Sequence, residues 1–84
     1  MRVPTILRVG GLRLVIYLND HRPAHVHVIG AGRETVFELN CPDGPPKVRE
    51  GAGYRSKELS TLTRVLWDRL AQLCEAWRSI HGDP

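Results

Sequence analysis

The chain has 84 residues, which is enough for one domain with one modest core and leaves no room for a second. Hydrophobic residues make up 42% of it, so we expect a folded chain and not a disordered one. No apolar run approaches the roughly 20 residues that cross a bilayer, so no membrane partner is expected.

The N-terminal stretch lacks the apolar segment of a secretory signal, which makes the cytoplasm the expected location. In that compartment Cys41 and Cys74 are predicted to be reduced thiols. Without CxxC spacing they do not predict a cysteine zinc site. A chain this small also gains stability from oligomerisation, so a homo-oligomer (a dimer) or a hetero-oligomer is expected.

The net charge of +3 is unevenly distributed along the chain. Residues 1–33 hold five arginines against one aspartate, whereas residues 34–84 hold seven basic and eight acidic residues. The basic half is compatible with an anionic partner such as a nucleic acid, or with a basic surface that is simply solvated.

The first predicted hairpin joins strands at 5–9 and 12–18 through Gly10-Gly11, a two-residue turn that fixes the register. Val9 then faces Leu12 and Arg8 faces Arg13. Further along the same strands, the register predicts the pairs Leu7–Leu14, Ile6–Val15 and Thr5–Ile16. Like charges directly opposite each other destabilise a sheet, so an anion, a carboxylate or solvent is expected to compensate the two arginines.

The second predicted hairpin has strands at 25–29 and 33–39. A two-residue turn at Ala31-Gly32 sets Val28 against Thr35, and this register is favoured because it gives one apolar face. The same register also predicts the pairs Val26–Phe37 and His25–Glu38. His25 and His27 then project from the opposite face.

Residues 40–55 hold three prolines and three glycines and predict a long loop, with an optional short strand at 47–50. A single helix is predicted over 57–81, with Ser56 as its N-cap, and it would be about 37 Å long at 1.5 Å per residue. A small sheet cannot cover all of its apolar stripe, so part of the stripe is predicted to contact another chain. The predicted interface residues are Leu66, Leu70, Leu73, Trp77 and Ile80.

These elements predict an α+β domain over residues 1–84. It is an antiparallel meander of four strands, or five with the short strand at 47–50, packed against one long C-terminal helix.

Two motifs carry a resemblance to a known family. "PTILR" at 4–8 and "NDHRPAHVHV" at 19–28, together with the C-terminal helix, resemble the small bacterial family called domain of unknown function 4160. The family pattern usually has a second proline at the position of Ala24. Its members often look like one half of a toxin–antitoxin-type gene pair. The resemblance therefore implies a small adjacent protein as partner and a mobile-element or defence context, and it gives no reaction.

Four interpretations of the histidines remain open. In the first, His25 or His27 acts as a general acid or base polarised by Glu38, while arginines hold the phosphate of an RNA substrate. In the second, His25 and His27 bind a divalent metal ion, with His21, Asp20 or Glu38 as the third ligand.

In the third, the region is a binding surface without chemistry. In the fourth it is structural, with His21 capping the turn and His25 paired with Glu38. The third is preferred, and the small histidine- or metal-dependent ribonuclease is the alternative, so enzyme activity stays undecided. The predicted binding residues are Arg8, Arg13, Tyr17, Asp20, His21, Arg22, His25 and His27.

Overall fold

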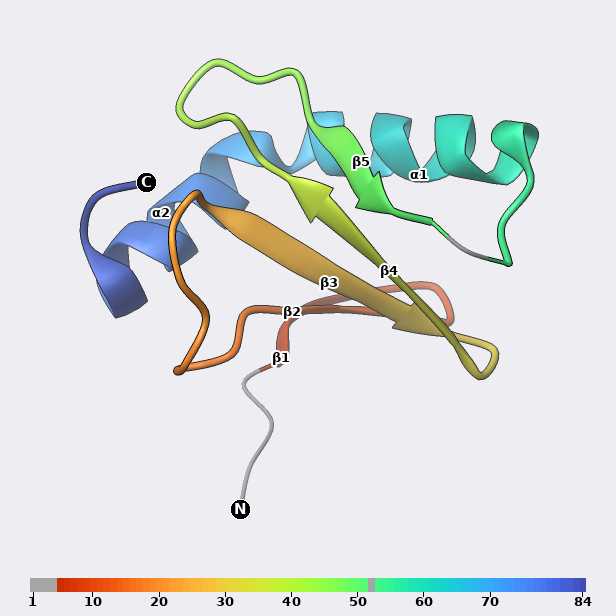
Figure 1. Ribbon diagram of the computed structural model, residues 1–84, viewed down its shortest axis with the longest axis horizontal. Coiled ribbons are helices and arrows are strands. Elements are labelled where there is room, and N and C mark those ends of the chain that lie inside the picture. Colours follow the sequence, from red (N-terminus) through yellow and green to blue (C-terminus); the bar gives the residue numbers. More distant parts are fainter. Residues whose placement is uncertain (1–4, 52) are drawn as a thin grey trace.

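The computed structural model describes residues 5–51 and 53–84 and confirms the α+β class. One five-stranded antiparallel sheet has the strand order β1-β2-β3-β4-β5. The first helix lies over one face of this sheet, and the second lies beside the end of the sheet where β3 begins (Figure 1). The strands are β1 (Thr5–Val9), β2 (Leu12–Val15), β3 (His25–Gly30), β4 (Arg33–Glu38) and β5 (Lys47–Glu50). The helices are α1 (Ser56–Asp68) and α2 (Leu70–His81).

The first hairpin has the predicted register near its turn and departs from it further away. The pairs Val9–Leu12, Arg8–Arg13 and Leu7–Leu14 form as predicted, with Gly10 in the left-handed conformation at φ 58°. The register then shifts between Thr5 and Leu7, so Thr5 is opposite Val15. The predicted pairs Ile6–Val15 and Thr5–Ile16 are therefore wrong, because a bulge adds one residue to β1 and moves the partner.

The second hairpin has the predicted register throughout. Val26 pairs with Phe37, Val28 with Thr35 and His25 with Glu38. Ala31 and Gly32 both have positive φ, 50° and 73°, as a primed two-residue turn requires. This register places His25 and His27 on one side of β3, next to each other and near its start.

The second strand is shorter than predicted: β2 ends at Val15 and not at residue 18. The physical reason is Asp20, whose Oδ2 accepts a hydrogen bond from the Tyr17 backbone N–H at 2.9 Å, while Asp20 N–H donates to the Tyr17 carbonyl at 3.1 Å. These two bonds form a tight turn that takes residues 17–20 out of the sheet.

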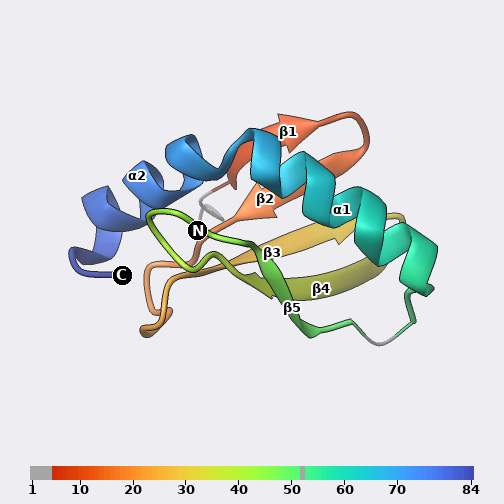
Figure 2. The same cartoon turned by 90° about the horizontal axis from the view of Figure 1, so that it is seen from above.

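The predicted single helix over 57–81 is wrong, because Arg69 (φ −121°, ψ 14°) separates α1 from α2. Its N–H bonds to the carbonyl of Leu66 at 3.1 Å, which tightens the last turn of α1. The helix axis changes direction there, and α2 lies beside the end of the sheet where β3 begins (Figure 2). The predicted N-cap Ser56 is also corrected: Arg55 is the N-cap, and its backbone N–H donates to Glu58 Oε1 at 2.9 Å.

The break in the helix removes the surplus apolar surface from which the interface was predicted. Four of the five residues assigned to that interface are buried in the chain's own core, and Ile80 is partly buried and packs against that core. We therefore correct the assignment: these are core residues, because their side chains pack into the hydrophobic core of the chain itself. The four buried residues are Leu66, Leu70, Leu73 and Trp77.

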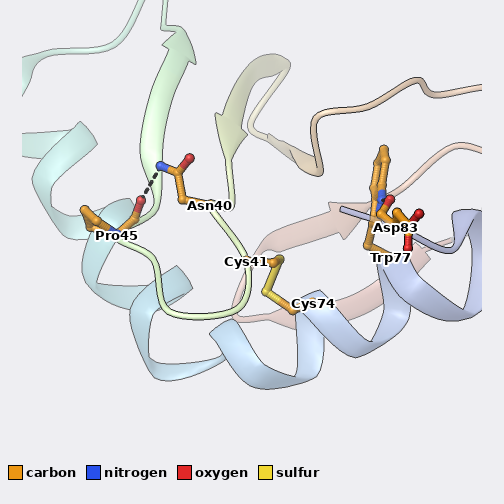
Figure 3. Close-up of a disulfide and its surroundings, with 6 residues drawn as sticks. All are labelled: Asn40, Cys41, Pro45, Cys74, Trp77 and Asp83. Carbon is orange, nitrogen blue, oxygen red and sulfur yellow. Dashed lines mark hydrogen bonds between the residues drawn. A yellow bond between two sulfur atoms is a disulfide. The ribbon is translucent and has the colours of Figure 1, made fainter.

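The prediction of reduced thiols is wrong for this structure, which joins Cys41 to Cys74 in a disulfide (Figure 3). The bond ties the loop after β4 to α2, across 33 residues of sequence. Within the same loop, the Asn40 side chain donates a hydrogen bond to the Pro45 carbonyl at 2.8 Å. The loop is thus held against α2, the helix whose far end reaches the histidines.

Candidate functional site

A polar cluster lies where the loop after β2 meets the start of β3. Asp20 Oδ1 is 3.4 Å from His25 Nε2 and 3.3 Å from His27 Nε2. The three side chains form a group whose ligand-type atoms all lie within 4.8 Å of one another. The two hydrogen bonds between Asp20 and Tyr17 fix the carboxylate in this position, and the pleat of β3 places both histidines on the same side.

Each imidazole is oriented by a hydrogen bond at its other nitrogen. His25 Nδ1 lies 2.8 Å from the carbonyl oxygen of Pro23, and His27 Nδ1 lies 2.8 Å from Glu34 Oε2. A carbonyl or carboxylate oxygen accepts, so the Nδ1 atoms donate. In the neutral form of each ring, Nε2 is then the nitrogen with the lone pair, and both Nε2 atoms face Asp20.

Aromatic side chains enclose the cluster. His25 is 3% exposed and packs against Trp77 of α2, with ring centroids 5.3 Å apart. Tyr17 meets the edge of His27 at a centroid distance of 4.7 Å. His81, at the end of α2, stacks on Trp77 at 4.2 Å and its Nε2 lies 3.0 Å from the Tyr17 carbonyl. The site is therefore built jointly by the sheet, the loop and the last helix.

The predicted site residues separate into two groups. Tyr17, Asp20, His25 and His27 come together, whereas His21 and Arg22 are exposed and lie outside the Asp20–His25–His27 group. A role for His21 as a metal ligand alongside the two strand histidines is therefore not supported by its position.

The acid paired with the histidines differs from the prediction. Glu38 is opposite His25 in the sheet register, but the His25 ring contacts Asp20 and Pro23, and the carboxylate bonded to His27 is that of Glu34. Glu34 lies diagonally across the hairpin, two residues from Val36, which pairs with His27. The correction follows from side-chain reach, because a diagonal neighbour on one face is also within reach of a long side chain.

Sequence reasoning missed Glu34 and His81 as parts of the site and assigned Trp77 elsewhere. Glu34 could have been found from the predicted register by considering diagonal neighbours of His27. The contact of His81 with Tyr17 joins residues 64 apart in sequence, so no local pattern signals it.

Arg8 and Arg13 lie on the same face of the sheet as His27, directly opposite each other. Arg8 is exposed and Arg13 is half-buried. In the described part of the chain, the arginines in ion pairs with carboxylates are Arg33 and Arg78.

A separate ion pair lies at the start of α1, away from the histidines. Arg33 donates to both carboxylate oxygens of Glu58, at 3.2 and 2.9 Å. The Arg33 hydrogen bonds, with a smaller contribution from the Arg55 backbone N–H, lower the pKa of Glu58 from 4.5 to about 2. This pair helps to fix the N-terminus of α1 to β4.

The fold and the site define a small α+β domain with a histidine–carboxylate cluster at one end of its sheet. The family model named Domain of unknown function (DUF4160) matches residues 11–78, so the chain belongs to this family, as the motifs predict. The match includes the loop and strand that form the cluster. No curated protein and no solved structure matches the chain. Neither helix in the described residues is long and apolar enough to cross a membrane.

Proposed function

We propose that the protein is a small binding component of a bacterial toxin–antitoxin-like or mobile-element-related pair. It acts as a homo- or hetero-oligomer. Its contacts are with the adjacent small protein of that pair and with nucleic acid. The observation that carries the proposal is the pair of arginines, Arg8 and Arg13, directly opposite each other on the sheet face that also carries His27.

Physical chemistry supports an anionic partner for this face. Two guanidinium groups in one cross-strand pair repel each other, and a bound phosphate would remove that cost. Arginine presents a planar fork that binds phosphate oxygens two at a time. The helix α1 covers the opposite face, and Arg8 is exposed and Arg13 half-buried, so a partner can approach the two arginines (Figure 1).

The test uses the protein together with its gene neighbour. The pair is co-expressed and purified through a tag on the neighbour, and the nucleic acid that accompanies it is quantified. We expect co-purification, and we expect Arg8→Glu with Arg13→Glu to reduce the bound nucleic acid at least tenfold. The matched control is Arg64→Glu with Arg78→Glu, which changes net charge equally at exposed helix positions.

Loss of nucleic acid in both double variants would assign binding to net charge alone and contradict the proposed face. Failure to co-purify with the neighbour would contradict the proposed gene pair.

The cytoplasmic location is part of the same proposal. It is tested by cell fractionation, with rapid alkylation of free thiols to show whether Cys41 and Cys74 are joined in the cell. The reducing conditions of the cytoplasm oppose such a disulfide.

A second candidate is a small histidine- or metal-dependent ribonuclease. The observation that favours it is the hydrogen bond from His27 to Glu34. A carboxylate thus orients a histidine on the sheet face that also carries Arg8 and Arg13. End-labelled RNA should then be cleaved by the wild type and by His21→Ala, and His27→Gln should abolish the cleavage. Intact RNA after incubation with the wild type, with and without added divalent ions, would contradict this candidate.

A further inference from the structure

The Asp20–His25–His27 cluster brings together three atoms that all accept. With Nδ1 of each histidine donating to its own partner, the neutral rings direct Nε2 lone pairs at Asp20 Oδ1. Two lone pairs and a carboxylate oxygen at such distances repel one another unless something electropositive lies among them. The occupant is either protons, which make the rings imidazolium, or a metal cation.

We propose that this cluster is a binding site for a divalent transition metal of the zinc class, with His25 Nε2, His27 Nε2 and Asp20 Oδ1 as ligands. This inference does not depend on nuclease activity or on nucleic-acid binding. It concerns the ligand set alone and is tested by metal binding.

The distances favour a cation over protons. Charge-assisted N–H···O bonds are about 2.7–2.9 Å long, shorter than the two Nε2–Oδ1 separations of 3.4 and 3.3 Å. Two ligand atoms bound at 2.0–2.1 Å to one tetrahedral ion lie roughly 3.3–3.4 Å apart, which agrees with both separations. The ligand atoms that the three residues offer all lie within 4.8 Å of one another, so rotation of the rings can bring them around one ion.

The surroundings have the second layer of contacts that metal sites require. Ligating histidines usually donate their other N–H to a carboxylate or a backbone carbonyl, which fixes the ring and makes it a better ligand. Here Glu34 serves His27 and the Pro23 carbonyl serves His25. Tyr17 N–H holds the second oxygen of Asp20, which leaves Oδ1 for the ion.

Charge and burial also suit a divalent cation. Asp20 and Glu34 carry two negative charges around neutral rings, and a divalent ion balances them. The side chains of His25, His27 and Asp20 are 4%, 14% and 12% exposed, so the ligands are largely withdrawn from water while the site stays accessible. Trp77 and Tyr17 form its apolar walls.

The donor set indicates which ion binds. Imidazole nitrogens suit zinc, cobalt, nickel and copper, whereas calcium and magnesium require oxygen ligands. Three protein ligands on a tetrahedral ion leave one position for water or for an atom of a partner molecule.

The test is titration of the oxidised, untagged protein with Zn²⁺ by calorimetry and with Co²⁺ by visible absorption. We expect one ion per chain and the intense absorption of tetrahedral Co²⁺. Asp20→Asn, which keeps the shape of the side chain, should weaken binding at least tenfold. Glu34→Gln, which alters only the layer behind His27, should weaken it about 10- to 100-fold. The matched control, His21→Ala, removes an exposed histidine beside Asp20 and should leave binding unchanged.

Two results would overturn the proposal. One is the absence of stoichiometric binding of Zn²⁺, Co²⁺ and Ni²⁺ to the wild type. The other is binding that persists in both Asp20→Asn and His27→Gln, or that is lost in His21→Ala, because the ion would then be held by surface histidines. Circular dichroism on each variant confirms that a lost site is not a lost fold.

Discussion

Trp77 packs against His25 with ring centroids 5.3 Å apart, so the last helix forms the wall behind the histidine cluster. The indole is 1% exposed and its N–H donates to the Asp83 carbonyl at 3.0 Å. His81 also packs against this indole, at a centroid distance of 4.2 Å, and its Nε2 lies 3.0 Å from the Tyr17 carbonyl oxygen. A single buried tryptophan therefore connects the core, the C-terminal residues and the site.

This position predicts a large stability effect. Trp77→Ala should lower the free energy of unfolding by about 3–5 kcal/mol, because it leaves a cavity in the core and an unpaired carbonyl. Equilibrium urea unfolding followed by circular dichroism measures it. Trp67→Ala, at a tryptophan that is 46% exposed, is the control and should cost clearly less. Equal costs at the two positions would contradict the burial on which the assignment of Trp77 to the core rests.

The disulfide gives a second prediction. Joining Cys41 to Cys74 closes a loop of about 33 residues, and the chain-entropy model assigns such a closure roughly 3–4 kcal/mol of stability. Reduction of the wild type should therefore lower its free energy of unfolding by about that amount. Cys41→Ser with Cys74→Ser should be equally destabilised and should not respond to reductant. A wild type that is indifferent to reductant would indicate that the bond is not formed in solution.

The sequence predicts those parts of this fold that are set by local turns. Gly10-Gly11 and Ala31-Gly32 each allow a two-residue primed turn, and such a turn leaves little freedom of register. The bulge near Ile6 and the end of β2 at Val15 were not predictable in this way. The end of β2 depends on the Asp20 carboxylate, which accepts a hydrogen bond from the backbone N–H of Tyr17. The bulge in β1 has no marker in the local sequence.

The break at Arg69 has no local signal either, because no glycine or proline marks it. We attribute it to tertiary packing, since the change of direction goes with the burial of Leu73 and Trp77 of α2 in the core. The histidine pair was predictable as a pattern on β3, and Glu34 could be found from the register as a diagonal neighbour of His27. The place of Asp20 could not, because its contact with His25 depends on how the loop after β2 folds.

The pair of Arg33 and Glu58 predicts a pH dependence. The pKa of Glu58 is lowered from 4.5 to about 2 in the folded protein, so the folded state binds this proton less tightly than the unfolded state does. The stabilisation is therefore complete above about pH 4.5 and is lost as the pH falls toward 2. Glu58→Gln should flatten the loss of stability in that window and leave stability elsewhere nearly parallel to the wild type.

An NMR titration of the Glu58 carboxyl carbon gives the direct measurement. The Arg33→Gln variant should raise the Glu58 pKa toward 4.5 without reaching it, because the Arg55 backbone N–H still donates to the carboxylate. A wild-type pKa near 4.5 would show that the pair does not persist in solution, where both side chains are 39% exposed.

The last prediction concerns the salt dependence of nucleic-acid binding. Each phosphate neutralised by a protein cation contributes roughly 0.7–0.9 to the slope of log affinity against log salt concentration. If Arg8 and Arg13 each bind a phosphate, Arg8→Gln with Arg13→Gln should reduce the slope by about 1.4–1.8 and weaken binding similarly for all sequences. Fluorescence anisotropy with labelled RNA and DNA, from low salt upward, measures both quantities. Arg64→Gln with Arg78→Gln removes the same charge from the helix side and should leave the slope nearly unchanged. Two outcomes would contradict this prediction: a slope that falls equally in both double variants, or a wild type that binds neither nucleic acid at low salt. Either would show that water, and not a bound phosphate, screens the repulsion between Arg8 and Arg13.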